Sequence, residues 1–563
     1  MSRLHASLII LAMTGVACGS GSGGGTNPPP PGKTPDTQNP PAEITPAASG
    51  EWYRKAVFYE VFVRSFQDSN GDGKGDLKGL LSRLDYLNDG NPDTTQDLGV
   101  DALWLMPVFD SPSYHGYDVV DYERIEPDYG TLEDFELLCA EAHRRGMRVI
   151  LDFVINHSGV GHPWFVESAS SPTSAKRGWY VWKDQDPGWK QPWSPFSNYP
   201  TWHARNGAYY YGVFWDGMPD LNLQNPELRT EVKRLASLWL SRGADGFRLD
   251  AARYLIETGA GPGQADTPET HAFWKEFAAH VRQEKPDAVL VGENWSTTPI
   301  VATYYGSTAE VPGGDELPLN FNFGISEQIL AGLNANNAAP IAAKLAEMAR
   351  VYPAGVSDAP FLTNHDMVRV ATQLGGNAGK LANAAALLLT LPGAPFLYYG
   401  EELGLSNGTA NNDEAKRTPM PWDDTAGGGF TTGTPWFSFS PGYTTGRNVA
   451  AQANAAGSLL SRYRALIRAR RASEALSRGG LKLLSPTQGA QAMLSFVRTL
   501  GEERVLVVHN LTDYSVSAGP FDLPGSTPEV LFADSNVSAL SKTASGWQAS
   551  LPPRATGIWR LQP

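Results

Sequence analysis

The chain has 563 residues, which is long enough for several domains and for a large buried core. Its formal net charge is -14 and no basic stripe occurs along it, so we expect no nucleic-acid partner. Its two cysteines, Cys18 and Cys139, lie in very different sequence contexts, and we expect no disulfide framework.

Residues 1–17 have the composition of a secretory signal peptide, with Arg3 before an apolar run that is too short to span a membrane. The stretch Gly15-Val-Ala-Cys18 resembles the cleavage box of bacterial lipoproteins, in which the cysteine becomes the lipidated first residue. Because Gly15 stands where an aliphatic residue is usual, a plain secretory signal is the alternative. We expect Cys18 to carry a lipid.

Residues 18–50 are rich in glycine and serine and then in proline, with almost no apolar side chains. Such a composition cannot form a core and predicts an extended tether. The leader, the cysteine and the tether together predict an extracellular or cell-surface protein that is anchored to the outer membrane. The lipid would be its only contact with a membrane.

The next part of the chain alternates short apolar strands with helices of helical apolar spacing. The strands are predicted at residues 57–62, 102–105, 148–154, 246–249, 289–292, 319–323, 360–362 and 395–399. The clearest helices are predicted at residues 77–87, 131–145, 226–241, 268–283 and 458–471. Eight such strands predict a (β/α)₈ TIM barrel, an α/β fold, built from residues 51–157 and 223–474.

Two segments depart from this alternation. Residues 158–222 are too long for a structureless loop, so we expect a small domain inserted after the third strand. Residues 475–563 change to short strands separated by turn residues, which predicts a C-terminal antiparallel β-sandwich. Its strands are predicted at residues 481–484, 493–498, 504–508, 529–532 and 557–561.

Polar residues gather where the predicted barrel strands end, and barrels of this kind carry their active sites there. They are Asp152, Asn156, His157, Arg248, Asp250, Glu293, Asn364, His365 and Asp366. Arg248 shares its strand face with Asp250 and would keep that carboxylate ionised, which suits a nucleophile. A structural ion pair is the alternative for these two residues alone. Polar groups at four strand ends favour an active site.

These motifs closely resemble the α-amylase family of glycoside hydrolases, from about Tyr53 to the end of the chain. The matching stretches are Asp152-Phe-Val-Ile-Asn-His157, Gly246-Phe-Arg-Leu-Asp250, Val291-Gly-Glu-Asn294, Phe361-Leu-Thr-Asn-His-Asp366, Gly393-Ala-Pro395, Tyr399-Gly-Glu-Glu402 and Arg417-Thr-Pro-Met-Pro-Trp422. A further stretch, Met218-Pro-Asp-Leu-Asn222, resembles members intermediate between oligo-1,6-glucosidases and neopullulanases.

The resemblance implies a catalytic set. Asp250 would be the nucleophile, Glu293 the general acid/base, and Asp366 the residue that holds and distorts the sugar. Retention needs two carboxyl groups about 5–5.5 Å apart, and neighbouring strands can supply that spacing. Glu293 must be protonated to act first as an acid, so we expect its pKa to be raised.

The resemblance also implies a substrate-binding set. His157 and His365 would hydrogen-bond the sugar beside the cleaved bond, and Tyr117 would lie under it. Asp413 and Arg417 would contact that sugar's 4-hydroxyl. Packing of loops is the alternative for each of these five residues.

The function implied is that of a retaining, endo-acting α-amylase that hydrolyses α-1,4 bonds of starch and maltooligosaccharides as a monomer. Exo-acting relatives carry an acid at the position of Tyr114. The tyrosine found there in this chain favours cutting inside chains. After Asp250 come Ala-Ala-Arg253-Tyr254, where many family amylases have Lys-His, so the leaving-group contacts stay open. The alternatives are a cyclomaltodextrinase-like or neopullulanase-like enzyme, a glucan-transferring enzyme, and a non-catalytic starch-binding barrel.

A loop after the first strand carries oxygen-bearing side chains at every second residue, a spacing that suits Ca²⁺. The predicted ligands are Asp68, Asn70, Asp72, the carbonyl of Lys74, and Asp76, by resemblance to a metal loop of the family. The glutamate that an EF-hand needs at its twelfth position is missing. A solvated acidic turn is the alternative.

Overall fold

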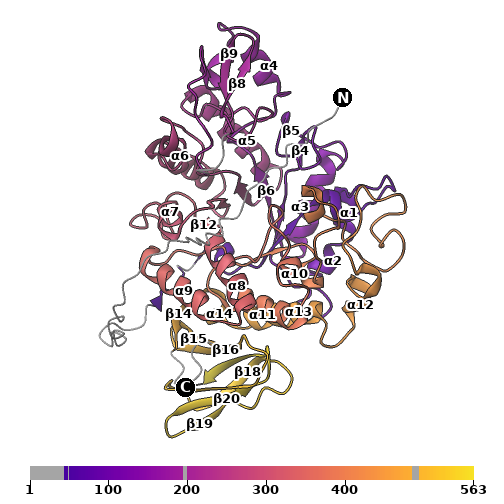
Figure 1. Ribbon diagram of the computed structural model, residues 1–563, viewed down its shortest axis with the longest axis vertical. Coiled ribbons are helices and arrows are strands. Elements are labelled where there is room, and N and C mark those ends of the chain that lie inside the picture. Colours follow the sequence, from indigo (N-terminus) through magenta and orange to yellow (C-terminus); the bar gives the residue numbers. More distant parts are fainter. Residues whose placement is uncertain (1–42, 48–49, 194–198, 485–492, 563) are drawn as a thin grey trace, which may run out of the picture.

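The computed structural model describes residues 43–47, 50–193, 199–484 and 493–562. At its centre lies a parallel sheet in the order β12-β11-β10-β6-β3-β2-β13 (Figure 1). Its strands are β2 (Phe58–Val61), β3 (Ala102–Leu105), β6 (Arg148–Phe153), β10 (Gly246–Leu249), β11 (Val289–Gly292), β12 (Leu319–Asn320) and β13 (Phe396–Tyr398). Single parallel bridges, Phe321 to Ala359 and Phe361 to Phe396, join the two outer strands, so the sheet closes into a TIM barrel.

The strand predicted at residues 360–362 is therefore present only as isolated bridges. Pro360 has no amide hydrogen to give to a ladder, which limits pairing there. The strand predicted at 319–323 is also shorter, because helix α8 begins at Phe323. The side chain of Asn322 caps that helix by accepting a hydrogen bond from the amide of Ile325.

Helices surround the sheet. They are α1 (Leu77–Ser82), α2 (Leu84–Leu87), α3 (Leu132–Arg144), α5 (Pro226–Ser241), α6 (Pro268–Glu284), α7 (Thr298–Thr303), α8 (Phe323–Ala335), α9 (Ala339–Val351), α10 (Val370–Gln373), α11 (Ala378–Thr390), α12 (Val449–Ala453), α13 (Leu459–Arg471) and α14 (Glu474–Arg478). The single helix predicted at residues 77–87 is two helices that meet at Arg83. The guanidinium of Arg83 lies over the ring of Trp422 and donates to Gln67, contacts that accompany the break.

The interior of the barrel is filled by aromatic side chains. Phe58 and Phe396 stack with ring centroids 4.2 Å apart, and Trp104 packs against Phe321. All four are buried, so the barrel is a packed core and not a channel. Functional groups must therefore lie at its rims.

The segment inserted after β6 contains helix α4 (Pro163–Ser170) and an antiparallel sheet in the order β7-β9-β8. Those strands are β7 (Trp182–Lys183), β8 (Trp202–Arg205) and β9 (Ala208–Tyr211). A two-stranded sheet, β4 (Phe109–Asp110) with β5 (Asp121–Ile125), follows β3. Figure 1 shows the inserted segment at one end of the molecule and the C-terminal strands at the other.

The C-terminal part is a β-sandwich of two antiparallel sheets. The larger sheet has the order β1-β14-β15-β16-β21-β18, in which β1 (Glu43–Ile44) comes from the predicted tether, and the smaller has the order β17-β20-β19. Its strands are β14 (Gly480–Leu483), β15 (Met493–Leu500), β16 (Glu503–Asn510), β17 (Val516–Phe521), β18 (Thr527–Ala533), β19 (Ser541–Thr543), β20 (Gly546–Leu551) and β21 (Thr556–Gln562). Side chains of both sheets, including Leu506, Trp547 and Trp559, form its core. Strands β17, β19 and β20 were not expected from the sequence. Strand β17 contains Gly519 and Pro520, and β19 is polar, so neither has the apolar pattern of a strand.

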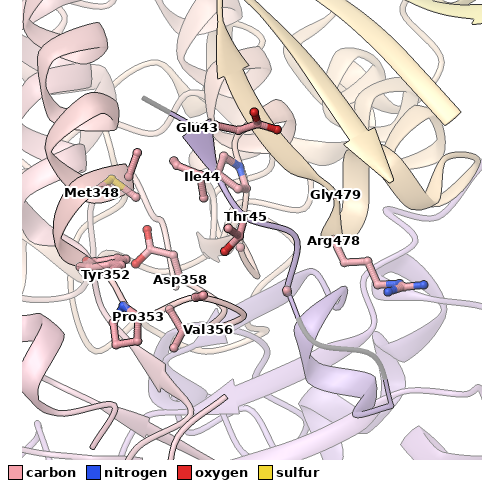
Figure 2. Close-up of a pocket in the computed structure, with 15 residues that line it drawn as sticks. Glu43, Ile44, Thr45, Met348, Tyr352, Pro353, Val356, Asp358, Arg478 and Gly479 are labelled. Carbon is pink, nitrogen blue, oxygen red and sulfur yellow. The ribbon is translucent and has the colours of Figure 1, made fainter. Parts of the chain in front are cut away.

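Part of the predicted tether is docked on the folded body. Strand β1 (Glu43–Ile44) pairs antiparallel with β14, and Thr45 accepts a hydrogen bond from the amide of Gly355. This segment covers a cavity of about 130 Å³ whose walls include Tyr352 and Asp358 (Figure 2). Asp358 precedes the bridges of the seventh strand, so the cavity lies at the opposite rim from the carboxyl ends of the strands.

The predicted signal peptide, Cys18 and most of the predicted tether fall in residues 1–42 and 48–49, which lie outside the described residues. Within the described ranges, no helix has the length and apolar character needed to cross a membrane.

Candidate active site

Asp250 and Glu293 lie side by side at the carboxyl rim of the barrel. Each follows the last residue of its strand, and the register pairs Leu249 of β10 with Gly292 of β11. Directly after Asp250, Ala251 has a φ of 50°, a left-handed conformation that an alanine rarely adopts. This turn points the amide of Ala251 at Glu293, which accepts its hydrogen bond at Oε2 over 3.0 Å.

Arg248 is the cation at the centre of this rim, and it is fully buried. Its Nη1 donates to Asp250 Oδ1 over 2.7 Å and to both carboxylate oxygens of Asp152 over 2.9 Å. Its Nη2 lies 2.8 Å from Glu293 Oε2. Asp152 is one of the polar strand-end residues noted in the sequence, but no catalytic or substrate-binding role was expected for it. The sequence feature that indicates a role for Asp152 is the presence of an acid inside an apolar strand.

Burial controls the charge of the two neighbouring acids. It raises the pKa of Glu293 to about 7 and the pKa of Asp250 to about 6, although Arg248 acts in the opposite direction on both. The pKa of Glu293 is therefore raised, as expected from its role. For Asp250, Arg248 offsets only part of the rise in pKa that burial causes. Near neutral pH the rim therefore holds one partly protonated acid beside one mostly ionised carboxylate. Such a pair can supply a proton and a nucleophile.

His365 lies between two further carboxylates. Its Nδ1 is 2.6 Å from Glu60 Oε1 and its Nε2 is 3.2 Å from Asp366 Oδ2. Burial favours the neutral ring, but Asp366 and Glu60 outweigh it and raise the pKa of His365 to about 9. Burial likewise disfavours the Asp366 carboxylate, but His365 and Arg417 hold its pKa well below its usual range.

Glu60 was not expected at the site. It is 2% exposed and lies in β2, where its neighbours are apolar. The sequence feature that could have indicated its role is a single acid inside an apolar strand. Burial of an unpaired charge is costly, so such an acid is expected to have a charged partner.

Tyr117 and His157 form one wall of the site. The Tyr117 hydroxyl lies 2.6 Å from His365 Nε2 and donates to Asp152 over 3.0 Å, and its ring stacks on that of His365. The ring nitrogens of His157 lie 2.9 Å from Asn156 Oδ1 and 3.1 Å from the carbonyl of Tyr117. Burial lowers the pKa of His157 to about 3, so its ring is neutral.

Asp413 and Arg417 lie on the other side of Asp366. Arg417 Nη2 is 2.8 Å from Asp413 Oδ2 and 3.1 Å from Asp366 Oδ1. The hydroxyl of Tyr114 donates to Asp413 over 3.3 Å and accepts from Arg417 over 3.2 Å. Lys416, which the sequence analysis did not single out, is 2.7 Å from Asp413 Oδ1. The structure therefore gathers all the predicted catalytic and substrate-binding residues at one rim.

The predicted metal ligands lie together in the loop before α1. Asp68 accepts hydrogen bonds from three backbone amides of its own loop. Asn70 accepts from the amide of Asp72, and Asp72 from that of Lys74. Asp76 caps helix α1 through the amide of Gly79.

The donor set of this loop fits a hard cation, because its side chains present only oxygen atoms. In the described part of the chain, however, no three side chains of the types His, Cys, Asp or Glu converge to hold a metal ion. The predicted set relies instead on the amide oxygen of Asn70 and the carbonyl of Lys74. The Ca²⁺ site therefore stays a proposal.

The sequence is similar to known glycoside hydrolases along most of its length. The family described as "Alpha amylase, catalytic domain" matches residues 60–479. Alpha-amylase 3 of Dictyoglomus thermophilum is 40% identical over 466 residues, which cover 82% of this chain and 85% of that protein. Trehalose synthase of Pimelobacter sp. is 36% identical over 518 residues, which cover 82% of this chain and 88% of that protein.

The fold matches a solved structure of the same family. The crystal structure of an alpha-amylase from H. orenii has a TM-score of 0.80 and 36% identity, and the match covers 90% of this chain and all of that one. The motifs, the barrel and its acidic rim agree with these comparisons. The chain belongs to the alpha-amylase family of retaining glycoside hydrolases.

Proposed function

We propose that this enzyme hydrolyses α-1,4-glucosidic bonds of starch and maltooligosaccharides by double displacement. The observation that carries the proposal is the pairing of Asp250 and Glu293 on neighbouring strand ends, both within 3 Å of Arg248. A partly protonated Glu293 beside an ionised Asp250 supplies the acid and the nucleophile that retention requires.

In the first half of the reaction, Asp250 attacks the anomeric carbon and the glycosidic C–O bond breaks. The proton of Glu293 passes to the leaving sugar oxygen. In the second half, Glu293 takes a proton from water, the water oxygen bonds to the anomeric carbon, and the ester bond to Asp250 breaks. No other reactant is needed.

Asp366 stays ionised beside the imidazolium of His365, so this pair can hold sugar hydroxyls through charge-assisted hydrogen bonds. Arg417 and Asp413 offer donors and acceptors for the next hydroxyl. His157 contributes less directly to binding of the sugar, because both of its ring nitrogens face protein partners.

We infer an endo mode of cutting from Tyr114. A phenol at this position, stacked on Trp436 with ring centroids 5.6 Å apart, replaces the acid of exo-acting relatives. Aromatic rings tolerate a glucan that continues past the cleaved sugar, whereas a carboxylate there would grip the chain end.

We further propose that Ca²⁺ binds at Asp68, Asn70, Asp72, Lys74 and Asp76. The ion would supply a cross-link for a loop that lies away from the acids. We also propose that Cys18 carries a lipid, so that the enzyme acts outside the cell on a surface anchor. The leader and the Gly/Ser/Pro-rich stretch that follows it support this location.

Transfer of glucose to a sugar acceptor is the second candidate activity. The similarity to a trehalose synthase favours it, because that name describes a relative that makes glycosides. A barrel that only binds starch is disfavoured, since binding alone does not require buried acids with raised pKa values.

The first products of the reaction test the proposed function. Soluble starch, pullulan, a cyclodextrin, trehalose and maltose are incubated with the pure enzyme, and NMR records the anomer formed in the first minutes. We expect new α-anomeric ends from starch, faster than from the other substrates. First appearance of the β-anomer, or no cleavage of starch, would reject the proposal.

A further inference from the structure

Glu60 lies inside the barrel, just below the carboxyl rim. It is in register with Trp104 of the neighbouring strand β3, and it shares its own strand face with Phe58 of the barrel core. Only 2% of its surface is exposed, so its carboxylate is out of reach of a sugar at the rim. Any effect of Glu60 on the reaction must therefore act through another side chain.

The two arginines of the rim are paired with other acids. Arg248 binds Asp152, Asp250 and Glu293, and Arg417 binds Asp366 and Asp413. In the part of the chain that the structure describes, the ion pair of Glu60 with His365 is its only one. Because a buried carboxylate without a cation is costly, the charge of Glu60 favours a proton on this ring.

Both ring nitrogens of His365 face carboxylates. Nδ1 lies 2.6 Å from Glu60 Oε1, and Nε2 lies 3.2 Å from Asp366 Oδ2. An ionised carboxylate can only accept hydrogen bonds, and a neutral imidazole has a single N–H group to donate. Donation to both carboxylates at once therefore requires the imidazolium form.

Side chains from several strand ends surround this ring. Trp104 packs against it edge to face, with ring centroids 5.7 Å apart. The charged and titratable groups that face it are Glu60 of β2, Tyr117 between β4 and β5, Asp152 of β6, Arg248 of β10, Asp366 beside it, and Arg417 after β13. Burial favours a neutral ring, but Asp366 and Glu60 raise the pKa of His365 to about 9.

A second arrangement of the same atoms places the proton on Glu60, which then donates it to a neutral Nδ1. Burial raises the pKa of Glu60 above its usual value and favours this form, whereas His365 and Arg248 oppose the rise. Asp366 at the other nitrogen favours the imidazolium, because a second carboxylate stabilises the charge of the ring.

We propose that Glu60 is a positioning residue that keeps His365 protonated and directs its Nε2–H group towards Asp366 and a hydroxyl of the reacting sugar. This inference rests on the proposed function for its contact with the sugar. A charge-assisted hydrogen bond is about twice as strong as a neutral one. The proton held by Glu60 thus sets how firmly the site grips that sugar.

The first test follows the proton on His365 and needs no substrate. NMR of enzyme with ¹⁵N-labelled histidine records the ring nitrogens over a range of pH, and a His365→Asn variant assigns the signals. The pKa of His365 should be about 9 in the unchanged enzyme and about 7 in Glu60→Gln, because an adjacent opposite charge shifts a pKa by about 1–3. A ring that loses its proton below pH 7 in the unchanged enzyme would overturn the proposal, even if Glu60→Gln did not fold.

The second test compares kcat/KM of Glu60→Gln with that of the unchanged enzyme on soluble starch. Near pH 6 both rings are protonated, so the two rates should agree within about twofold. Near pH 8.5 only the unchanged enzyme keeps the proton, and the variant should be about tenfold slower, the difference between a charge-assisted and a neutral hydrogen bond. If starch is not cleaved, the proposed function fails alone, and the NMR titration still tests Glu60.

Two further variants serve as controls. Glu60→Asp keeps the charge, so it should restore most of the rate near pH 8.5. Glu316→Gln removes the acid partner of His271, 2.7 Å away, on helix α6 outside the sheet. It should change neither the titration of His365 nor the dependence of the rate on pH.

Two patterns of rates would overturn the proposal. A loss of rate in Glu60→Gln that is equal near pH 6 and near pH 8.5, with no recovery in Glu60→Asp, would reduce Glu60 to a packing role. No loss at either pH would place the proton on Glu60, because the amide of glutamine can donate to Nδ1 as a carboxylic acid does.

Discussion

Asp250 and Glu293 contact the two terminal nitrogens of one guanidinium group, at 2.7 Å and 2.8 Å. Arg248 therefore sets the position and the electrostatics of both acids at once. Because Arg248 also binds the buried Asp152, its own position does not depend on either catalytic candidate. The acids can thus be changed one at a time while the cation stays in place.

Asp250→Asn and Glu293→Gln should each lower starch hydrolysis by roughly 10⁴-fold or more, as removal of one member of a catalytic set does. Both amides keep the shape of the acids, so the melting temperature should change little. Activity is measured on soluble starch, and folding by thermal denaturation. A variant that keeps most of the turnover with a normal melting curve would contradict the assigned role.

The pH dependence of kcat/KM should be bell-shaped. Burial raises the pKa of Asp250 to about 6 and that of Glu293 to about 7. The rate should rise as Asp250 loses its proton and fall as Glu293 loses its proton at higher pH. The two apparent values belong to the interacting pair. A profile that stays flat from pH 7 to pH 9 would show that Glu293 is not the acid.

Removal of Ca²⁺ should lower the melting temperature more than it lowers turnover at room temperature. An ion that binds only the folded state stabilises it by about 2.7 kcal/mol at a hundredfold excess over Kd. The measurement is thermal unfolding with and without a chelator, together with metal analysis.

Asp72→Ala should remove this effect of the chelator. Asp89→Ala is its control, since Asp89 accepts the amide of Asn91 as Asp72 accepts that of Lys74, but outside the proposed metal loop. Unchanged metal content in Asp72→Ala would refute the site.

Cys18→Ser should release the enzyme from the membrane fraction or stall its processing. Stable anchoring needs more than one acyl chain, which a lipoprotein cysteine can carry. Fractionation of cells followed by starch assays measures the distribution. Equal membrane association of Cys18→Ser and the unchanged protein would leave a plain secretory leader as the better account.

Amylose should lose its iodine colour early, while few reducing ends have formed. Tyr114 lies beside Asp413 and Arg417 and offers a ring where exo-acting relatives carry an acid. Cuts inside the chain shorten it quickly, which explains the expected loss of colour. Glucose as the dominant first product, with the colour persisting, would reject this interpretation of Tyr114.

Much of the barrel could be predicted because its strands are short and mostly apolar. The strands predicted at residues 102–105, 246–249 and 289–292 have these bounds in the structure. The second and third of these strands end directly before Asp250 and Glu293, which belong to the candidate site. The same local pattern of residues therefore predicted both these strands and the site at their ends.

Other features depend on contacts between distant residues. Glu60 and His365 lie 305 positions apart, and only closure of the barrel brings them to 2.6 Å. Strand β1 forms because it pairs with the edge strand β14, although the surrounding sequence has the composition of a tether.

By itself, then, the sequence determined the alternation of strands and helices, the order of the motifs and the chemical types of the acids. The tertiary structure decided which charges share a partner and how far burial raises the pKa of Glu293. The physical reason is that desolvation and pairing depend on neighbours in space, which a local pattern of residues does not encode.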